Sequence, residues 1–410
     1  MEHEATGAVA AERGSRNEAT RQRNLAAVLT RVHHAPGITR AQLTQQTGLN
    51  RSTVGALVGD LVEAGAVYES ATATTRVGRP SPAVSPCDDN TAIAVNPDVD
   101  GIEVALVALG GRVLDSRMTE VTATITARDA IATAVSMARD ILTAHPGRTV
   151  WGAGVAIPGL VNIAERSVVR APHLEWQYEP FGAMLQEELQ MPVWVENDAK
   201  AGLVAESIFG AARGARNVIY LNGSPSGIGG GILAGGRLVA GEDGFAGELG
   251  HITVDRNGIA CHCGRIGCLE SEVNIRRLRA AASVDRFGPG GLATRLAQSD
   301  SPALEAEAGR QADILARGIA NIVSVLNPGM VVLGGFLGDL LDFRHDEIVS
   351  GVAKHAFDPM ADGLEIARAE LGNDRIAVGA AEAAFRPLLA DPLRMLTDAN
   401  AAGATRALLA

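Results

Sequence analysis

The sequence predicts an α/β protein built from a small helical head and a larger body. Three observations support this prediction. Apolar residues recur at helical spacing within residues 20–88, short apolar strands alternate with helices from Thr91 onward, and one His and three Cys gather between Gly250 and Glu270. With 410 residues, the chain is long enough for two or three domains that each bury a core.

Charge is distributed unevenly along the chain. The formal net charge is −11, yet residues 13–79 contain nine Arg and four acidic residues, a local charge of +5. A basic head on an acidic body indicates that only the head meets a polyanion. No run of about 18 apolar residues is present, so no membrane span is expected. A lone Cys87 and closely spaced thiols suit a reducing compartment, which favours a cytoplasmic protein.

The head is predicted to contain three helices. Residues 1–19 are polar and Ala-rich without periodicity, and are expected to form a flexible arm. Apolar residues at 25, 28, 29 and 32 then have the spacing of an amphipathic helix, which Pro36-Gly37 ends. Thr39 is expected to cap a second helix that runs to Gly48. Asn50 is expected to cap a third, whose predicted buried face is Val54, Leu57, Val58, Leu61 and Val62.

Two helices joined by a short turn that contains Gly predict a helix-turn-helix, and strand-like residues 67–69 and 83–85 predict a wing. The first turn of the second helix in such a module faces the major groove of DNA. The alternative is a protein-interaction module, but the local charge of +5 favours DNA. For Arg79, insertion into a minor groove and a solvated wing tip both stay open. The predicted DNA contacts are Arg40, Arg51, Ser52, Thr53, Arg76 and Arg79.

The body, predicted over residues 91–390, alternates strands and helices, and residues 391–410 are expected to be a tail. Glycine-rich turns divide it into two halves, which indicates two lobes with a cleft between them. Helices are expected at 127–144, after Asn197-Asp198 and at 304–326. Strands are expected at 93–95, 104–109, 113–116, 150–157, 193–196, 217–221, 228–233 and 330–333.

One His and three Cys of the body lie in metal-ligand spacing. His251 is followed by Cys261, Cys263 and Cys268, so three of the four cysteines fall within eight residues. This is the ligand set of a closed, structural Zn²⁺ site. The alternative is a disulfide cluster, but the N-terminus does not resemble a secretory signal and a Cys-x-Cys pair rarely closes on itself. His262 is a weaker competitor, because its side chain is not expected to converge with those of both neighbours.

Several segments of the body resemble the ROK family of sugar kinases and sugar-responsive repressors. They are the zinc segment, Ile157-Pro158-Gly159, and residues 196–199, 247–251 and 326–335, and the resemblance spans roughly residues 91–390. It implies a two-lobed, actin-like ATPase fold. Repressors of the family carry a winged helix-turn-helix in front of this body, as this chain does.

The resemblance also implies a sugar site. In family kinases a carboxylate of the Asn-Asp pair deprotonates the attacking sugar hydroxyl, and Asp198 occupies that position here. Zinc would orient His251 so that its second nitrogen faces a sugar hydroxyl. Helix capping is the alternative role of Asn197-Asp198. The predicted sugar-binding residues are Asn197, Asp198, Glu248, His251 and Glu270.

The phosphate-binding turn departs from the family pattern. Family kinases hold ATP phosphates with Asp-x-Gly-Gly-Thr, where this chain has Asn96-Pro97-Asp98-Val99-Asp100. The glycines that let backbone N–H groups approach phosphate are lost. Two carboxylates facing a triphosphate repel it, by about 1–4 kcal/mol for each pair at about 4 Å. The second phosphate loop is altered as well, to Ser224-Pro225-Ser226. An inactive kinase homologue is therefore predicted.

The sequence thus predicts a sugar-responsive transcriptional regulator of carbohydrate metabolism, with repression as the expected mode. The alternative is an active ROK sugar kinase with an accessory DNA-binding head, and a weaker third is a DNA-bound scaffold without a small ligand. The expected partners are double-stranded DNA with a palindromic operator, a sugar or sugar derivative, and further copies of the chain in a homodimer or homotetramer. Structural Zn²⁺ is the expected cofactor.

Overall fold

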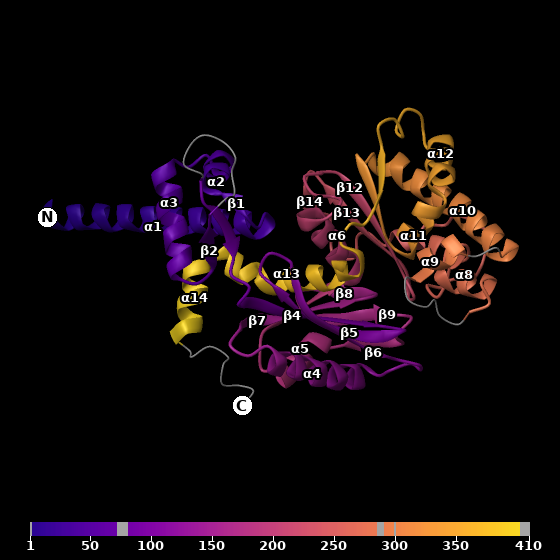
Figure 1. Cartoon of the computed structure of the whole chain (residues 1–410), viewed down its shortest axis with the longest axis horizontal. Coiled ribbons are helices and arrows are strands. Elements are labelled where there is room, and N and C mark those ends of the chain that lie inside the picture. The colour runs from indigo at the N-terminus through magenta and orange to yellow at the C-terminus, as the bar shows by residue number, and fades with distance from the viewer. Residues whose placement is uncertain (1, 72–80, 285–290, 299–300, 402–410) are drawn as a thin grey trace.

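The computed structural model describes residues 2–71, 81–284, 291–298 and 301–401 (Figure 1). Arg76 and Arg79, two of the predicted DNA contacts, lie outside these residues. The described part shows a head of three helices and a small sheet, and a body of two lobes. None of its helices is long and apolar enough to cross a membrane.

The head contains α1 (Glu2–His34), α2 (Arg40–Thr47) and α3 (Arg51–Glu63). The predicted caps are confirmed. Thr39 forms a capping box with Gln42, Gly48 adopts the left-handed conformation that ends α2, and Asn50 accepts the backbone N–H of Thr53. An antiparallel sheet of order β1-β3-β2 completes the head, with strands Ile38–Thr39 (β1), Val67–Ser70 (β2) and Ala83–Pro86 (β3).

Two features of the head differ from the prediction. Residues 2–19, for which the sequence predicts a flexible arm, continue helix α1, because Ala, Glu and Arg favour a helix that tertiary packing has already nucleated further along. Val62 is 40 % exposed, so its predicted burial is wrong. It lies at the edge of the apolar face, whereas Val54, Leu57, Val58 and Leu61 are buried.

Lobe I is a five-stranded sheet of order β11-β7-β4-β5-β6. Its strands are Asn90–Asp98 (β4), Gly101–Ala108 (β5), Val113–Glu120 (β6), Thr149–Ile157 (β7) and Val193–Asn197 (β11). Helices α4 (Ala127–Ala144) and α5 (Phe181–Leu189) pack on one face. A small antiparallel sheet of Leu160–Asn162 (β8), Ser167–Ala171 (β9) and Trp176–Glu179 (β10) lies beside it.

Lobe II repeats the five-stranded plan with order β14-β13-β12-β15-β16. Its strands are Val218–Ser224 (β12), Gly227–Ala234 (β13), Arg237–Leu238 (β14), Met330–Gly335 (β15) and Glu365–Arg368 (β16). The helices of this lobe are Leu269–Glu272 (α7), Ile275–Ala281 (α8), Gly291–Gln298 (α9), Pro302–Leu326 (α10), Phe336–Phe343 (α11) and His345–His355 (α12).

Two helices lie between the sheets of the two lobes, α6 (Asp198–Phe209) and α13 (Arg375–Ala390) (Figure 1). They pack closely, because Gly379 has no side chain and a Cβ there would lie 1.9 Å from the carbonyl oxygen of Ala201. All the body strands and helices predicted from the sequence are present, but β8–β10, β14, β16, α5, α7–α9 and α11–α13 are not predicted. The expected tail contains a further helix, α14 (Pro392–Ala401).

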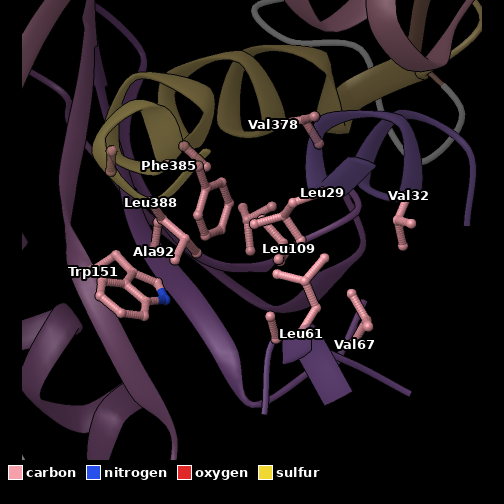
Figure 2. Close-up of a cluster of buried hydrophobic side chains, with 14 of the residues drawn as sticks. Leu29, Val32, Leu61, Val67, Ala92, Leu109, Trp151, Val378, Phe385 and Leu388 are labelled. Carbon is pink, nitrogen blue, oxygen red and sulfur yellow. The ribbon is translucent and has the colours of Figure 1, made fainter. Parts of the chain in front are cut away.

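The head and the body share one hydrophobic core. Leu29 and Leu61 of the head pack in the same cluster as Leu109 of lobe I and Phe385 of α13 (Figure 2). Leu396 of α14 is buried in this cluster too. The division predicted at residues 88–91 lies at the start of β4, but apolar packing crosses it. Because side chains in a packed core move little relative to one another, the head rests on the body as a fixed attachment.

Candidate functional site

The His and Cys residues predicted to bind metal converge. His251 ends a 3-10 turn, Cys268 precedes α7, and Cys261 and Cys263 lie on the loop between them. All four ligand atoms lie within 4.8 Å of one another. The Sγ atoms of Cys263 and Cys268 are 3.6 Å apart, as are Sγ of Cys261 and Nδ1 of His251. Tetrahedral Zn²⁺ with bonds of about 2.0–2.3 Å requires separations of about 3.5–3.8 Å, so this donor set fits the metal.

The two alternatives to this ligand set find no support. The chain's four cysteines all lie in the described residues, and all are free. His262 stays outside the cluster, and its ring packs instead against that of His173, with centroids 4.4 Å apart. Burial, with the carboxylate of Glu270 nearby, raises the pKa of Cys261, and its Sγ lies 3.0 Å from Oε1 of Glu270. A bound cation would convert this thiol to a thiolate.

A polar pocket lies beside the cluster and brings all five predicted sugar-binding residues together: Asn197, Asp198, Glu248, His251 and Glu270. Its own volume is about 50 Å³, but Glu248 and His251 also line a neighbouring cavity of about 240 Å³. His173 lines the pocket as well. Burial, together with nearby His262 and Arg276, lowers the pKa of His173 to about 4, so its ring is neutral at pH 7. We refer to this site as the polar pocket.

Asn197 and Asp198 occupy the junction of β11 and α6. Asn197 caps α6 through the backbone N–H of Lys200, and its Nδ2 donates to the carbonyl oxygen of Gly159, 3.0 Å away. The capping role weighed in the sequence is therefore realised, and one N–H of the amide remains for a ligand. Asp198 is 6 % exposed and accepts a 3.4 Å hydrogen bond from Nδ2 of Asn222.

The carboxyl groups of the pocket are held in an environment that disfavours their charge. Burial, with Asp98 nearby, raises the pKa of Asp198 to about 7. Burial also raises the pKa of Glu248, against the opposing effect of His251 and Lys200. Glu270 lies between the pocket and the metal cluster, with Oε1 3.4 Å from Nδ1 of His251. Hydroxyl donors of a sugar would stabilise these carboxylates in their ionised form.

The glycine-rich strand β13 brings these parts into contact. A Cβ at Gly227 would lie 2.3 Å from Oε2 of Glu270, and one at Gly229 would lie 2.6 Å from Cβ of Ala199. At Gly230 it would lie 2.3 Å from the carbonyl oxygen of Gly247. The run therefore allows the metal segment and the start of α6 to approach the same strand.

A second, larger cavity of about 480 Å³ lies between the lobes. We call it the interlobe cavity. The substituted turn at residues 98–100 lines it, together with Arg279, Arg368 and Arg375. Asp100 of lobe I forms a 3.0 Å ion pair with Arg279 of α8. Burial raises the pKa of Asp98 to about 6, although the backbone N–H of Val99 donates a hydrogen bond to its carboxylate and the nearby hydroxyls of Ser226 and Ser224 act in the opposite direction.

The predicted DNA-contacting residues lie around the start of α3. Arg51 and Ser52 are exposed there and Thr53 is partly buried. The hydroxyl of Ser52 lies 2.7 Å from the capping oxygen of Asn50. Arg40 is less available, because its guanidinium forms two hydrogen bonds with the carboxylate of Glu69.

Sequence reasoning missed several residues of the two cavities. His173 follows β9 in a segment with no recognised motif, and Asn222 and Arg375 are polar residues in apolar surroundings. Arg375 donates from Nε and Nη2 to Oδ1 of Asn222, at 3.1 and 2.9 Å. An Arg at the start of the long apolar run that follows it is the one signal that could have identified this contact.

Two five-stranded lobes that share central helices and enclose a cleft define the actin-like, sugar-kinase class of fold. The chain belongs to the ROK family, whose family model matches residues 92–386.

The comparisons include both regulators and enzymes. A putative xylose repressor of Caldicellulosiruptor sp. (strain Rt8B.4) is 28 % identical over 378 residues, which cover 87 % of this chain and 93 % of that protein. A glucokinase of Streptomyces coelicolor is 31 % identical over 328 residues, which cover 73 % of this chain and 99 % of the enzyme. The solved structure of a ROK family transcriptional regulator, described as a homologue of the E. coli MLC protein, matches with a TM-score of 0.73. The match covers 92 % of this chain and 99 % of the solved chain. Sequence identity is 22 %, so this likeness shows the fold alone.

Proposed function

We propose that this chain is a sugar-responsive transcriptional repressor that senses a sugar in a kinase-like body without phosphorylating it. The observation that supports this most is the polar pocket, which joins Asp198 and Glu248 to a metal-ligand cluster in a chain that also carries a basic head. Residues 1–88 are more than a fifth of the chain, so the repressor alignment, which covers 87 % of it, includes part of the head.

The head is proposed to be a winged helix-turn-helix that binds duplex DNA. Helices α2 and α3 with the β2–β3 hairpin have the required order, and exposed Arg51 and Ser52 stand at the start of α3. Backbone N–H groups at a helix N-terminus also favour a phosphate there. Because a palindromic operator presents two equivalent half-sites, the chain is proposed to bind it as a homodimer or a higher symmetric oligomer.

The cluster of His251, Cys261, Cys263 and Cys268 is proposed to hold a structural Zn²⁺. Bound through Nδ1, His251 would keep Nε2 available for a sugar hydroxyl in the polar pocket. The metal would supply rigidity and fix the ring orientation. Glu248, Glu270 and Asp198 would accept hydrogen bonds from sugar hydroxyls.

Sugar binding is proposed to reach the head through the two central helices. Asp198 begins α6, and Phe209 at the other end of α6 packs edge-on against His33 of the head, with ring centroids 5.4 Å apart. Arg375 begins α13 beside Asn222, and Phe385 near its other end packs against His33 too. A ligand that favours one arrangement of the lobes therefore shifts the same two helices that support α1.

The second candidate is an active sugar kinase. The raised pKa of Asp198, about 7, suits a general base, and the interlobe cavity has room for a ligand. The substituted turn argues against an active kinase, because the carboxylates of Asp98 and Asp100 line the cavity where phosphate would bind. A coupled ATPase assay with D-glucose and D-xylose separates the two candidates. Sugar-dependent ADP release at an ordinary enzyme rate would support the kinase.

DNA binding is tested by gel shift with duplexes that the full-length protein selects from a random-sequence pool. Affinity is expected to fall steeply with salt concentration. Arg51→Ala is expected to cost about 1–3 kcal/mol on the selected duplex if Arg51 contacts a base. The matched control is Arg213→Ala on the body. Selection of no duplex, or equal affinity of the wild-type protein and Arg51→Ala, would contradict the assignment of α3.

A further inference from the structure

The polar pocket and the interlobe cavity meet at two residues. Asp198 and Ser224 line both of them. A sugar hydroxyl that faces Asp198 in the polar pocket therefore also faces the interlobe cavity. A phosphate ester at that hydroxyl would extend past Asp198 and lie between the two lobes.

Asp98 stands at this exit, held from the opposite lobe. The hydroxyls of Ser224 and Ser226, at the β12–β13 turn of lobe II, face the carboxylate of Asp98 in lobe I and favour its charged form. The two hydroxyl oxygens are themselves 2.7 Å apart. The residues that stand in place of the two phosphate loops of a kinase, Asp98 on one lobe and Ser224 and Ser226 on the other, thus interact with one another across the cleft. A phosphate at this point would meet two carboxylates, those of Asp98 and Asp198.

Two of the three cations near this exit are already paired with carboxylates. Three Arg residues are found among the described residues that line the interlobe cavity, and no Lys. Arg279 pairs with Asp100 at 3.0 Å, and Arg368 pairs with Asp339 at 2.7 Å. Arg375 donates to Asn222 and to Tyr220.

The polar pocket itself offers no Lys or Arg charge to a phosphate ester. Its described lining contains neither Lys nor Arg. Its two histidines do not replace them, because His173 is neutral at pH 7 and Nδ1 of His251 faces the metal cluster. Within the lining of the polar pocket, a phosphate dianion would therefore meet carboxylates and no Lys or Arg, which is unfavourable.

We infer that Asp98, held by Ser224 and Ser226, makes the polar pocket selective for an unphosphorylated sugar and excludes the ester phosphorylated at the hydroxyl that faces Asp198. The inference rests on the proposed function, since it concerns the sugar of the same pocket. It assigns to the substituted turn a role in ligand selection: the turn separates a free sugar from its own phosphorylated form.

The test is isothermal titration of the full-length, metal-loaded protein with D-glucose, D-mannose, D-glucose 6-phosphate and D-mannose 6-phosphate. At least one free sugar is expected to bind, and its ester at least about 100-fold more weakly, as expected for uncompensated like charges at close range. In Asp98→Asn the ratio of the two affinities is expected to narrow at least about tenfold. Ser226→Ala, which releases one hydroxyl from Asp98, is expected to change the ratio in the same direction.

Glu103→Gln is the matched control, because Glu103 lines the interlobe cavity but not the polar pocket. It is expected to leave the ratio of affinities unchanged. An ester that binds the wild-type protein as tightly as its free sugar overturns the selection but leaves sugar sensing intact. The selection is also overturned if Asp98→Asn and Ser226→Ala both keep the wild-type ratio of affinities for the free sugar and its ester. If none of the four compounds binds the wild-type protein, the proposed sugar site fails and the selection fails with it.

Discussion

His33 of the head and Glu382 of the body are joined by a buried hydrogen bond between residues 349 positions apart. Nε2 of His33 lies 2.9 and 3.0 Å from the two carboxylate oxygens of Glu382, and the side chains are 0 % and 6 % exposed. Nδ1 accepts the backbone N–H of Gly110, 2.8 Å away. Because Nδ1 is an acceptor, the proton of the neutral ring must be on Nε2, where it donates to Glu382. One imidazole thus ties α1, lobe I and α13 together.

Removing this imidazole is expected to destabilise the whole chain. His33→Ala leaves a buried carboxylate and a buried N–H without their partner, and is expected to lower the free energy of unfolding by about 3 kcal/mol or more. Urea denaturation followed by circular dichroism measures the change. His345→Ala, at an exposed position, is the control and is expected to stay within about 0.5 kcal/mol of the wild-type protein. Equal stability of His33→Ala and the control would show that the head is not held through this contact.

The ion pair between Asp100 and Arg279 is expected to contribute measurably to the contact between the lobes. Its side chains are 27 % and 18 % exposed, so solvent screens it less than a surface pair. A double-mutant cycle with Asp100→Asn and Arg279→Gln is expected to give a coupling energy of about 1 kcal/mol, measured from unfolding free energies. The reversed pair, Asp100→Arg with Arg279→Asp, is expected to recover part of the loss. A coupling energy near zero would rule out this connection.

The buried carboxyl of Asp198 is expected to make stability depend on pH. Burial raises its pKa from 3.8 to about 7, so the folded protein binds this proton more tightly than the unfolded chain. The stabilisation from the protonated form is complete below about pH 4 and is lost as the pH rises through about 7. Asp198→Asn, which cannot ionise, is therefore expected to raise the Tm more at pH 8 than at pH 5. Thermal melts of the sugar-free protein at both pH values measure this, and equal shifts would contradict it.

Loss of one metal ligand is expected to cost both metal and stability. Cys263→Ser should abolish stoichiometric zinc and lower the Tm, because the free energy of metal binding is in part free energy of folding. Cys87→Ser, at the cysteine outside the cluster, is the control and should keep its zinc. Elemental analysis and thermal melts provide the measurement. A well-folded wild-type protein without zinc would overturn the assignment of the cluster.

Local signals in the sequence predict a large part of the fold. The caps at Thr39 and Asn50, the helix Ala127–Ala144 and the spacing of the metal ligands depend on residues close in sequence. Helix α13 is not predicted, because residues 375–385 are all buried and so lack the exposed polar positions that mark a surface helix. The contact between His33 and Glu382 could not be predicted either, since Glu382 lies in α13, 349 positions away in the sequence. The metal cluster could thus be predicted, whereas the connection from the pocket to the head required the assembled lobes.

Regulation by a sugar is tested by the affinity of the full-length protein for its selected DNA duplex, measured with and without the sugar that it binds. The sugar is expected to change this affinity by about 5- to 150-fold, the usual range of coupling between two sites. Asp198→Ala is expected to lose this response while its affinity for DNA without sugar stays at the wild-type value. A sugar that binds the polar pocket and leaves DNA affinity unchanged would contradict this regulation.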